Sequence, residues 1–413
     1  MRSRWMDPLR LLWASAALLL GTSCAGDAEF PPHQTPDDGP LYLVSGAVPT
    51  VDSTISVFAL VPSLDASVTP DLETSASVDG FAVALATDGA GSIFVAAAES
   101  GEIVKWTLGD DGLFPGSRLS LQGFGITSAV AGKVVILSPT KAYYIPIQQA
   151  REIIVFDPQT MTITGQFELG LPAIEGFATV TVPDTFVLRD DGTLVISTFY
   201  SSDYGLVFGD RVVVTAIDTA SDEVTASDED DRCGASWFMQ EATDGTLYIS
   251  GHVPHEVYRT FDSRAGAEVC QLRVLPPGSE FDDGYFVDLS TLTGGRPTGD
   301  FLLIDDDTAG ILAFHEEDAT PSDDIFEYTF QNAYRWYLWD FDDAEATLVQ
   351  TGNPGSVAGR RFFIDDVWYF QEENLVDLEG RNDSTLLTLA ADGDFSRGLT
   401  FPGGQIRNVL RLR

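Results

Sequence analysis

Two stretches of the chain carry side chains at spacings that metal ions use. In the first, His252 and His255 form a His-x-x-His pair beside Glu256. Two imidazoles hold a transition metal when a third strong ligand completes the site, and no such ligand follows nearby in the sequence. The spacing is that of a metal pair, but the missing ligand argues against a metal there.

The second stretch, "DDDTAGILAFHE" from Asp305, is similar to a calcium loop. Asp305, Asp307, Gly310 and Glu316 fall at positions one, three, six and twelve of that loop. Ala309 does not fit position five, and the flanking residues alternate as strands do rather than as helices. The stretch therefore favours a tight acidic turn, with structural calcium as the alternative and no other cofactor indicated.

Motifs for covalent or phosphate chemistry are missing from the sequence. It contains no GxSxG, no HExxH and no glycine-rich phosphate loop. We therefore predict no catalytic residue and expect a protein that is not an enzyme.

Cations and aromatic rings gather in "SPTKAYYIPIQQAR", residues 138–151. Lys141 is one of only three lysines in a chain with 63 acidic side chains, and Tyr143 and Tyr144 follow it. Aromatic faces next to cations suit a flat, anionic or ring-bearing ligand, through stacking and charge-assisted hydrogen bonds. Whether these side chains can meet a ligand depends on the elements that position them.

The N-terminus reads as an export signal. Three arginines precede the ten-residue apolar run Leu11 to Leu20, which is too short to span a bilayer, and small residues then lead into Cys24. We predict a lipoprotein-like signal over 1–23 with lipidation of Cys24, although Gly21 stands where such boxes usually have leucine; plain secretion is the alternative. Residues 24–40 are acidic and proline-rich, which predicts a disordered tether, and the folded part spans 41–413.

Charge and cysteine content narrow the partners. Removal of residues 1–23 leaves 20 basic and 62 acidic side chains, a formal charge of −42 (20 − 62). Such a surface repels nucleic acid and anionic lipid headgroups, so we expect no nucleic-acid partner and membrane contact through the lipid anchor only. Cys233 and Cys270 remain after Cys24, and an even pair in an exported protein predicts a disulfide rather than a metal site.

A repeat of about fifty residues organises the rest of the chain. "DGTLVIS" from Asp191 and "DGTLYIS" from Asp244 lie 53 positions apart, each a turn leading into an alternating strand. Similar stretches start at Asp88, Ala131, Thr298 and Ala358, and we interpret each as the second strand of a four-stranded unit. No amphipathic helix of ten or more residues is evident after the signal.

Four-stranded units at regular spacing indicate an all-β fold, a β-propeller. Six units start near Phe81, Ile126, Phe177, Trp237, Phe286 and Trp336. The C-terminal "GQIRNVLRLR" is one strand, and the N-terminal strands lack a first partner, so the last strand would join the first blade and close the ring. We predict a seven-bladed β-propeller, with a pair of sandwiches as the alternative.

This fold would bring the basic and aromatic residues together. Second-to-third-strand loops and inter-blade loops emerge on one face of a propeller, and we assign residues 138–150 to a second-to-third loop. The predicted ligand-binding residues on that face are Lys141, Tyr143, Tyr144, Tyr200, Tyr204, Tyr258, Arg259, Tyr334, Arg335 and Trp336. His252 and His255 would lie among them. In the alternative interpretation Lys141 offsets a neighbouring carboxylate and the tyrosines pack between blades.

Several short motifs carry a resemblance to a known family. The lipoprotein-like signal resembles that of the MxcI-type proteins of myxochelin siderophore clusters, and so do "YLVSG", "VPSLDA" from Val61, "RLSLQGFG" from Arg118, "SPTKAYY" from Ser138, "DDRC" from Asp230 and "CQLRV" from Cys270. The resemblance covers most of the mature chain. It implies an outer-membrane-associated lipoprotein that captures a ferric siderophore and works with an outer-membrane receptor, and it brings no ligand residues with it.

Three functions follow as hypotheses. The first is a lipid-anchored propeller that binds a small ligand, most simply a ferric siderophore, without chemistry. The second is a propeller hydrolase or lactonase in which carboxylates of the central channel hold a divalent cation. The third is a scaffold of the cell envelope whose acidic face binds a partner protein.

Overall fold

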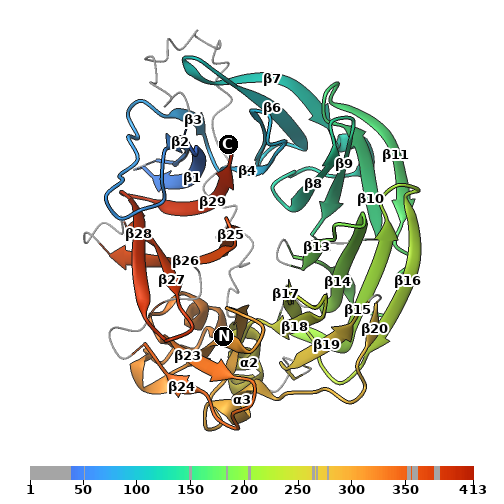
Figure 1. The fold of residues 1–413 in the computed structure, drawn as a ribbon, viewed down its shortest axis with the longest axis vertical. Coiled ribbons are helices and arrows are strands. Elements are labelled where there is room, and N and C mark those ends of the chain that lie inside the picture. Colours follow the sequence, from blue (N-terminus) through green and yellow to red (C-terminus); the bar gives the residue numbers. More distant parts are fainter. Residues whose placement is uncertain are drawn as a thin grey trace, which may run out of the picture. The chain divides into compact units, whose positions relative to one another are not determined.

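The computed structural model describes residues 39–50, 52–147, 151–182, 185–202, 206–262, 266, 268–276, 279–350, 355, 361–375 and 382–413. Within them the strands form seven antiparallel sheets, six of four strands and one of five. This organisation is that of a seven-bladed β-propeller, the predicted fold class (Figure 1). The predicted signal, Cys24 and the tether up to residue 38 lie outside the described residues.

The contacts divide the chain into two compact units, and the first two sheets belong to unit 1 (residues 1–128, 374–384 and 399–413). The first sheet has the order β29-β1-β2-β3: Gln405–Arg411, Tyr42–Pro49, Thr54–Val61 and Ala76–Asp79. The second runs β4 to β7: Ala82–Thr87, Ser92–Ala97, Glu102–Gly109 and Gly112–Ser120. Tyr42 pairs with Arg411, so the C-terminal strand completes the first blade as predicted.

The next three sheets lie in unit 2 (residues 129–373 and 385–398). The third contains β8 to β11: Gly132–Ser138, Lys141–Pro146, Glu152–Asp157 and Thr162–Glu168. The fourth contains β12 to β16: Ala178–Val180, Phe186–Leu188, Thr193–Ser202, Val207–Asp218 and Glu223–Asp230. The fifth contains β17 to β20: Ser236–Glu241, Leu247–Gly251, Gln271–Leu275 and Glu280–Phe281.

The last two sheets follow in chain order. The sixth contains β21 to β24: Thr298–Leu303, Thr308–Phe314, Tyr334–Asp340 and Thr347–Leu348. The seventh contains β25 to β28: Arg361–Ile364, Val367–Leu375, Asn382–Leu389 and Phe395–Phe401. Short helices interrupt the connections: η1 (Gln122–Phe124), α2 (Val253–Phe261), α3 (Leu289–Leu292), η3 (Glu316–Asp318) and η4 (Ile325–Phe330). No helix in the described residues is long and apolar enough to cross a membrane.

The repeated DGT turns have one local cause. The Asp191 carboxylate accepts a hydrogen bond from the Thr193 amide at 2.8 Å, and Asp244 does the same for Thr246 at 2.8 Å. The glycine between them has a left-handed backbone in both copies, with φ of 86° at Gly192. Each turn leads into the second strand of its sheet, as predicted.

The strand register was wrong for three other copies of the repeat. The stretches from Ala131, Thr298 and Ala358 contain or lead into β8, β21 and β25, which are the first strands of their sheets and not the second. Consequently two predicted unit starts are wrong: Phe286 lies between β20 and α3, and Trp336 lies in β23, a third strand. A turn followed by an alternating strand looks the same at either position, so local pattern alone did not separate the two.

The predicted disulfide between Cys233 and Cys270 is present. Cys233 precedes β17 and Cys270 precedes β19, so the bridge spans the connection that contains α2. Both cysteines are buried in a cluster with Val195, Met239 and Leu272. The bridge therefore ties the C-terminal end of the connection that contains α2 to the segment before β17.

Candidate functional site

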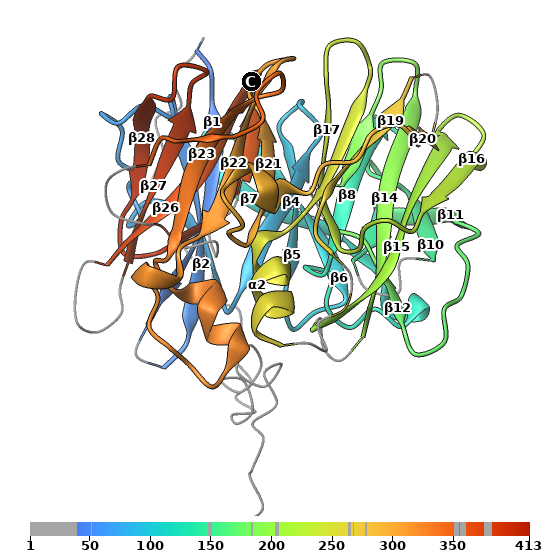
Figure 2. The same cartoon turned by 90° about the horizontal axis from the view of Figure 1, so that it is seen from below.

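A buried polar cluster lies where α2 begins, within unit 2. α2 is inserted between the second and third strands of the fifth sheet, and Figure 2 shows it beyond the ends of the neighbouring strands of that unit. His252 is the extended residue that precedes the helix, and Pro254 stands in the first turn, where a missing amide hydrogen has no cost. The end of β18 at Gly251 and the proline in the first helical turn thus fix the position of His252.

Asp300 of β21 holds the ring of His252. Its Oδ1 lies 2.5 Å from His252 Nδ1 and 3.4 Å from the Val253 amide nitrogen, and its side chain is 1% exposed. β21 approaches α2 closely because Gly299 has no side chain: a Cβ there would lie 2.6 Å from the Val253 nitrogen. Asp300 itself has a left-handed backbone, φ 57°, at a register shift in the strand. This conformation is uncommon for residues other than glycine, although aspartate and asparagine adopt it more readily than most.

Arg361, the first residue of β25, balances the same carboxylate. Its Nη2 lies 3.0 Å from Asp300 Oδ2, within ion-pair distance although not aligned as a hydrogen bond. The guanidinium carbon is 4.0 Å from the ring centre of Phe238 and 5.2 Å from that of Trp336. Strands of three consecutive sheets, β17, β21 and β25, therefore meet at one buried ion pair.

The electrostatics of the cluster follow from this arrangement. Burial alone would raise the pKa of Asp300, but the charges of His252 and Arg361 outweigh it and hold the pKa below its ordinary value. With Nδ1 facing Asp300, His252 has Nε2 left; that nitrogen has no hydrogen-bond partner among the described residues, and the side chain keeps 14% exposure. The tautomer with the proton on Nδ1 makes Nε2 an acceptor.

Aromatic rings surround both histidines. Trp237 stacks on His252, with ring centres 5.0 Å apart and planes 14° from parallel. It also meets His255 edge-on at 5.0 Å, and Phe208 lies 4.0 Å from the His255 ring. His255 is buried and its Nδ1 has no hydrogen-bond partner, and this burial sets its pKa well below the ordinary value. His255 is therefore a neutral imidazole at physiological pH.

Lys141, Tyr143 and Tyr144 do not lie in the predicted loop. They belong to β9, and residues 138–141 form the tight turn between the first and second strands. Lys141 Nζ lies 2.7 Å from Asp222 and donates to the Thr219 carbonyl at 2.6 Å, while the Tyr143 hydroxyl also donates to Asp222. Lys141 starts a second strand and His252 follows the end of one, so the two occupy opposite ends of their sheets.

Four of the other predicted ligand residues are engaged in hydrogen bonds or ion pairs within the protein. Tyr144 and Tyr200 are buried and donate to backbone carbonyls of Ala129 and Pro172. Arg335 bonds Asp318 at 2.8 Å and Arg259 pairs with Glu256 at 2.5 Å. Tyr204 lies outside the described residues.

Three further predicted residues, Tyr258, Tyr334 and Trp336, pack in the core around α2. Tyr258 is buried on the helix, and its hydroxyl lies 2.5 Å from that of Thr329. Tyr334 and Trp336 share a core cluster with Val253 and Val257 of α2. Among the predicted ligand residues that the structure describes, Trp336 contacts the polar cluster of His252, Asp300 and Arg361, through Arg361.

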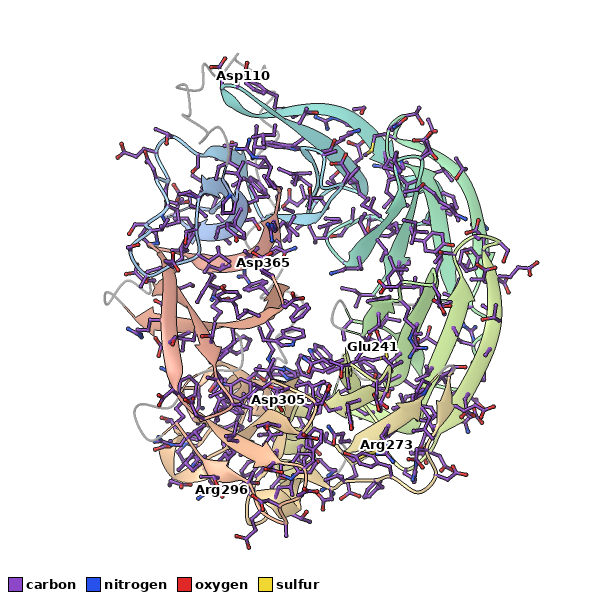
Figure 3. All side chains as sticks on the ribbon, in the orientation of Figure 1. Asp110, Glu241, Arg273, Arg296, Asp305 and Asp365 are labelled. Carbon is purple, nitrogen blue, oxygen red and sulfur yellow. A yellow bond between two sulfur atoms is a disulfide. The ribbon has the colours of Figure 1, made fainter. Side chains whose placement is uncertain are left out.

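The acidic stretch from Asp305 forms the favoured tight turn. The Asp307 amide donates to the Asp305 carboxylate at 3.1 Å in the turn between β21 and β22, where Figure 3 labels Asp305. Glu316 follows the far end of β22, a seven-residue strand that spans about 23 Å, so these residues do not form one loop. No group of three or more potential metal-ligating side chains occurs in the described part of the chain.

Sequence reasoning missed Asp300, Arg361, Trp237 and Phe238 as site residues. One signal was available for Asp300: it is the only charged residue in the apolar strand "TGDFLL", and a lone acid inside a buried strand needs a partner. The partner could not be found in the same way, because Arg361 is 61 positions away in a different sheet.

Comparisons with known proteins agree with the fold. No family model and no curated protein matches the chain. Among solved structures, it is similar to the periplasmic gluconolactonase of Pseudomonas aeruginosa, with a TM-score of 0.55 and 11% identity over 90% of this chain and 99% of that one. It is also similar to a hypothetical selenium-binding protein of Sulfolobus tokodaii, with a TM-score of 0.51 and 10% identity over 92% and 96%. At these identities the likeness shows the fold alone.

Proposed function

We propose that this protein is a small-molecule-binding β-propeller, with His252, Asp300 and Arg361 at its recognition site. The observation that carries the proposal is the buried Asp300 carboxylate, held in a left-handed conformation between a histidine and an arginine. Backbone strain and buried ion pairs both lower stability relative to apolar packing. A residue such as Asp300 that lowers stability in both ways, beside a partly exposed histidine, is typical of a functional site.

The chemistry of the cluster supports an anionic, ring-bearing ligand. The Arg361 guanidinium and the His252 ring both lie at the Asp300 carboxylate, so the cluster offers a cation and an imidazole. Trp237 supplies a half-buried aromatic ring next to it. A ferric catecholate siderophore has both properties, and the sequence resemblance to MxcI-type proteins is our reason for choosing it among ligands of this class.

Titration of the mature protein tests the site and the ligand class. Ferric catecholate siderophore and its iron-free form would be added to wild type and His252→Gln, with tryptophan fluorescence as the readout. Loss of one charge-assisted contact, about 1.5 to 3 kcal/mol, should weaken binding at least tenfold. Lys141→Ala is the matched control, because its ion pair lies at the other end of the sheets. Equal affinities of wild type and His252→Gln would refute the site, and no binding to wild type would refute the ligand class.

We also propose that the protein is exported and anchored at Cys24, and that it hands its ligand to an outer-membrane receptor. The arginines, the apolar run and the cysteine at the N-terminus support the anchor. Cys24→Ala should move the protein from the membrane fraction to the soluble fraction or stop its processing. Membrane association that persists in this variant would contradict the anchor.

Hydrolysis is the second candidate, because a histidine oriented by a buried carboxylate is the arrangement of a general base. One protein of similar fold is a gluconolactonase. Gluconolactone hydrolysis by wild type above the spontaneous rate, lost in His252→Gln, would favour this candidate. A wild type that does not exceed the spontaneous rate would leave ligand binding as the function.

A further inference from the structure

The rings of the two histidines at the start of α2 are neighbours, and their separation is one that a metal ion bound to both can have. Their ring centres are 5.5 Å apart and their planes are nearly perpendicular, at 88°. An imidazole nitrogen binds a transition metal at about 2.0–2.1 Å, which puts the ring centre about 3.2 Å from the ion. Two such rings have centres about 5 to 6 Å apart at the angles of tetrahedral and trigonal sites. The helix start holds this spacing, since the His255 amide donates to the His252 carbonyl at 2.9 Å.

Each ring is prepared for coordination in a different way. Histidines that bind metals usually donate the other ring N–H to a carboxylate, and His252 has that partner in Asp300 at 2.5 Å. His255 lies in an aromatic surrounding of Phe208, Trp237 and Tyr258, where a polar atom without a hydrogen-bond partner lowers stability. Its unpartnered Nδ1 is explained if the ring has a ligand to bind.

We propose that His252 and His255 form a binding site for a divalent transition-metal ion such as Zn²⁺, Ni²⁺ or Cu²⁺. Imidazole nitrogen suits these ions, whereas Ca²⁺ and Mg²⁺ prefer oxygen. Because the described residues supply no third His, Cys, Asp or Glu to this site, water or a small ligand completes the coordination. An ion bound by these rings would lie beside the Trp237 ring, which is 5.0 Å from both.

The copper complex of the wild-type protein gives the most direct test. The protein must carry no polyhistidine tag. With one equivalent of Cu²⁺, electron paramagnetic resonance should show nitrogen coupling from two imidazoles. Fluorescence should also be quenched, because Trp237 lies 5.0 Å from both rings. A spectrum with oxygen ligands only, or with one imidazole, would overturn the proposal without any variant.

Titration calorimetry of variants with Zn²⁺ and Ni²⁺ identifies the ligands. His255→Phe replaces the ring by one of similar shape in an aromatic surrounding and should weaken binding of one equivalent at least tenfold; His255→Gln is the alternative if the first does not fold. Asp305→Asn is the control for weak binding to exposed carboxylates and should match wild type. Unchanged affinity in both His255 variants would overturn the proposal. His255→Phe should still bind ferric siderophore, so this result and the failure of the proposed function can be told apart.

Discussion

Asp300 combines strain, burial and charge at one position. Its left-handed backbone is uncommon, and a carboxylate that is 1% exposed lowers stability unless it is paired. The pairing is supplied by His252 and Arg361. The three features support one another, because the unusual backbone aims the carboxylate at both partners. A single substitution at this residue therefore tests the whole cluster.

We expect Asp300→Asn to lower the free energy of unfolding by about 3 to 5 kcal/mol, since it removes the buried carboxylate charge that lies 3.0 Å from Arg361. Asparagine has nearly the same shape and tolerates the left-handed backbone, so the loss would report charge and not strain. Denaturant unfolding measures it. Arg361→Met combined with Asp300→Asn should cost less than the sum of the two single changes, and strict additivity would count against the ion pair.

The buried histidine predicts a pH dependence of stability. The folded pKa of His255 is well below that of the unfolded chain, so below about pH 6.5 the unfolded state binds the extra proton. Stability should therefore fall as the pH drops below 6.5, by at most about 1.4 kcal/mol per pH unit from this group. Unfolding at pH 7 and pH 5.5 measures the change. His255→Phe should show a smaller loss, and an equal loss in both proteins would contradict the assignment.

Lys141 was predicted either to bind the ligand or to offset a neighbouring carboxylate, and one measurement separates these interpretations. Its ion pair with Asp222 is about one quarter exposed on the lysine side and one third on the aspartate side, so its contribution is about 1 kcal/mol or less. We expect Lys141→Ala to lower stability by that amount and to leave siderophore affinity unchanged. A tenfold loss of affinity in this folded variant would restore the ligand role predicted from sequence.

At the scale of elements, the disulfide closes the segment of the chain that contains α2. The bridge closes a stretch of 37 positions that includes the whole helix, and the Gly234 amide donates to the Glu268 carbonyl at 3.0 Å beside it. The site histidines therefore sit on a segment that is tied at both ends. This tie lets a nine-residue helix, too short to be stable alone, carry site residues.

Removal of the bridge should be costly. In the chain-entropy model a loop of this length contributes about 4 kcal/mol, so the double variant Cys233→Ser and Cys270→Ser should unfold at lower denaturant concentration by that amount. Thiol labelling of the unfolded, non-reduced wild type should modify neither cysteine. Labelling of both residues would show that the bridge does not form in the protein.

At the scale of the whole molecule, β29 makes the first sheet complete. It pairs with β1 over six positions, and Leu412 beyond it is 1% exposed in a core cluster with Leu41 and Phe58. Phe401, just before β29, fills the space left by Gly46, where a Cβ would lie 2.3 Å from the ring. The first blade therefore needs residues from both ends of the chain.

Deletion of residues 405–413 should open the edge of β1 and expose its buried residues. We expect this truncated protein to aggregate or to melt well below wild type, as judged by size-exclusion chromatography and circular dichroism. Deletion of Arg413 alone, which removes its backbone hydrogen bonds with Leu41 but keeps β29, is the control and should have a much smaller effect. A monomeric truncated protein with an unchanged melting temperature would show that closure by β29 is not needed.

The sequence by itself determined the fold class, the closure by the last strand and the disulfide. These depend on turn residues, alternation and cysteine number, which are local or countable properties. Tertiary structure decided the strand register: residues 138–141 proved to be a first-to-second turn, so Lys141 meets Asp222 of the next sheet. It also decided the site, because His252, Asp300 and Arg361 come from three sheets and no spacing in the chain relates them. A local pattern identifies a strand, whereas only packing of sheet against sheet determines which side chains meet.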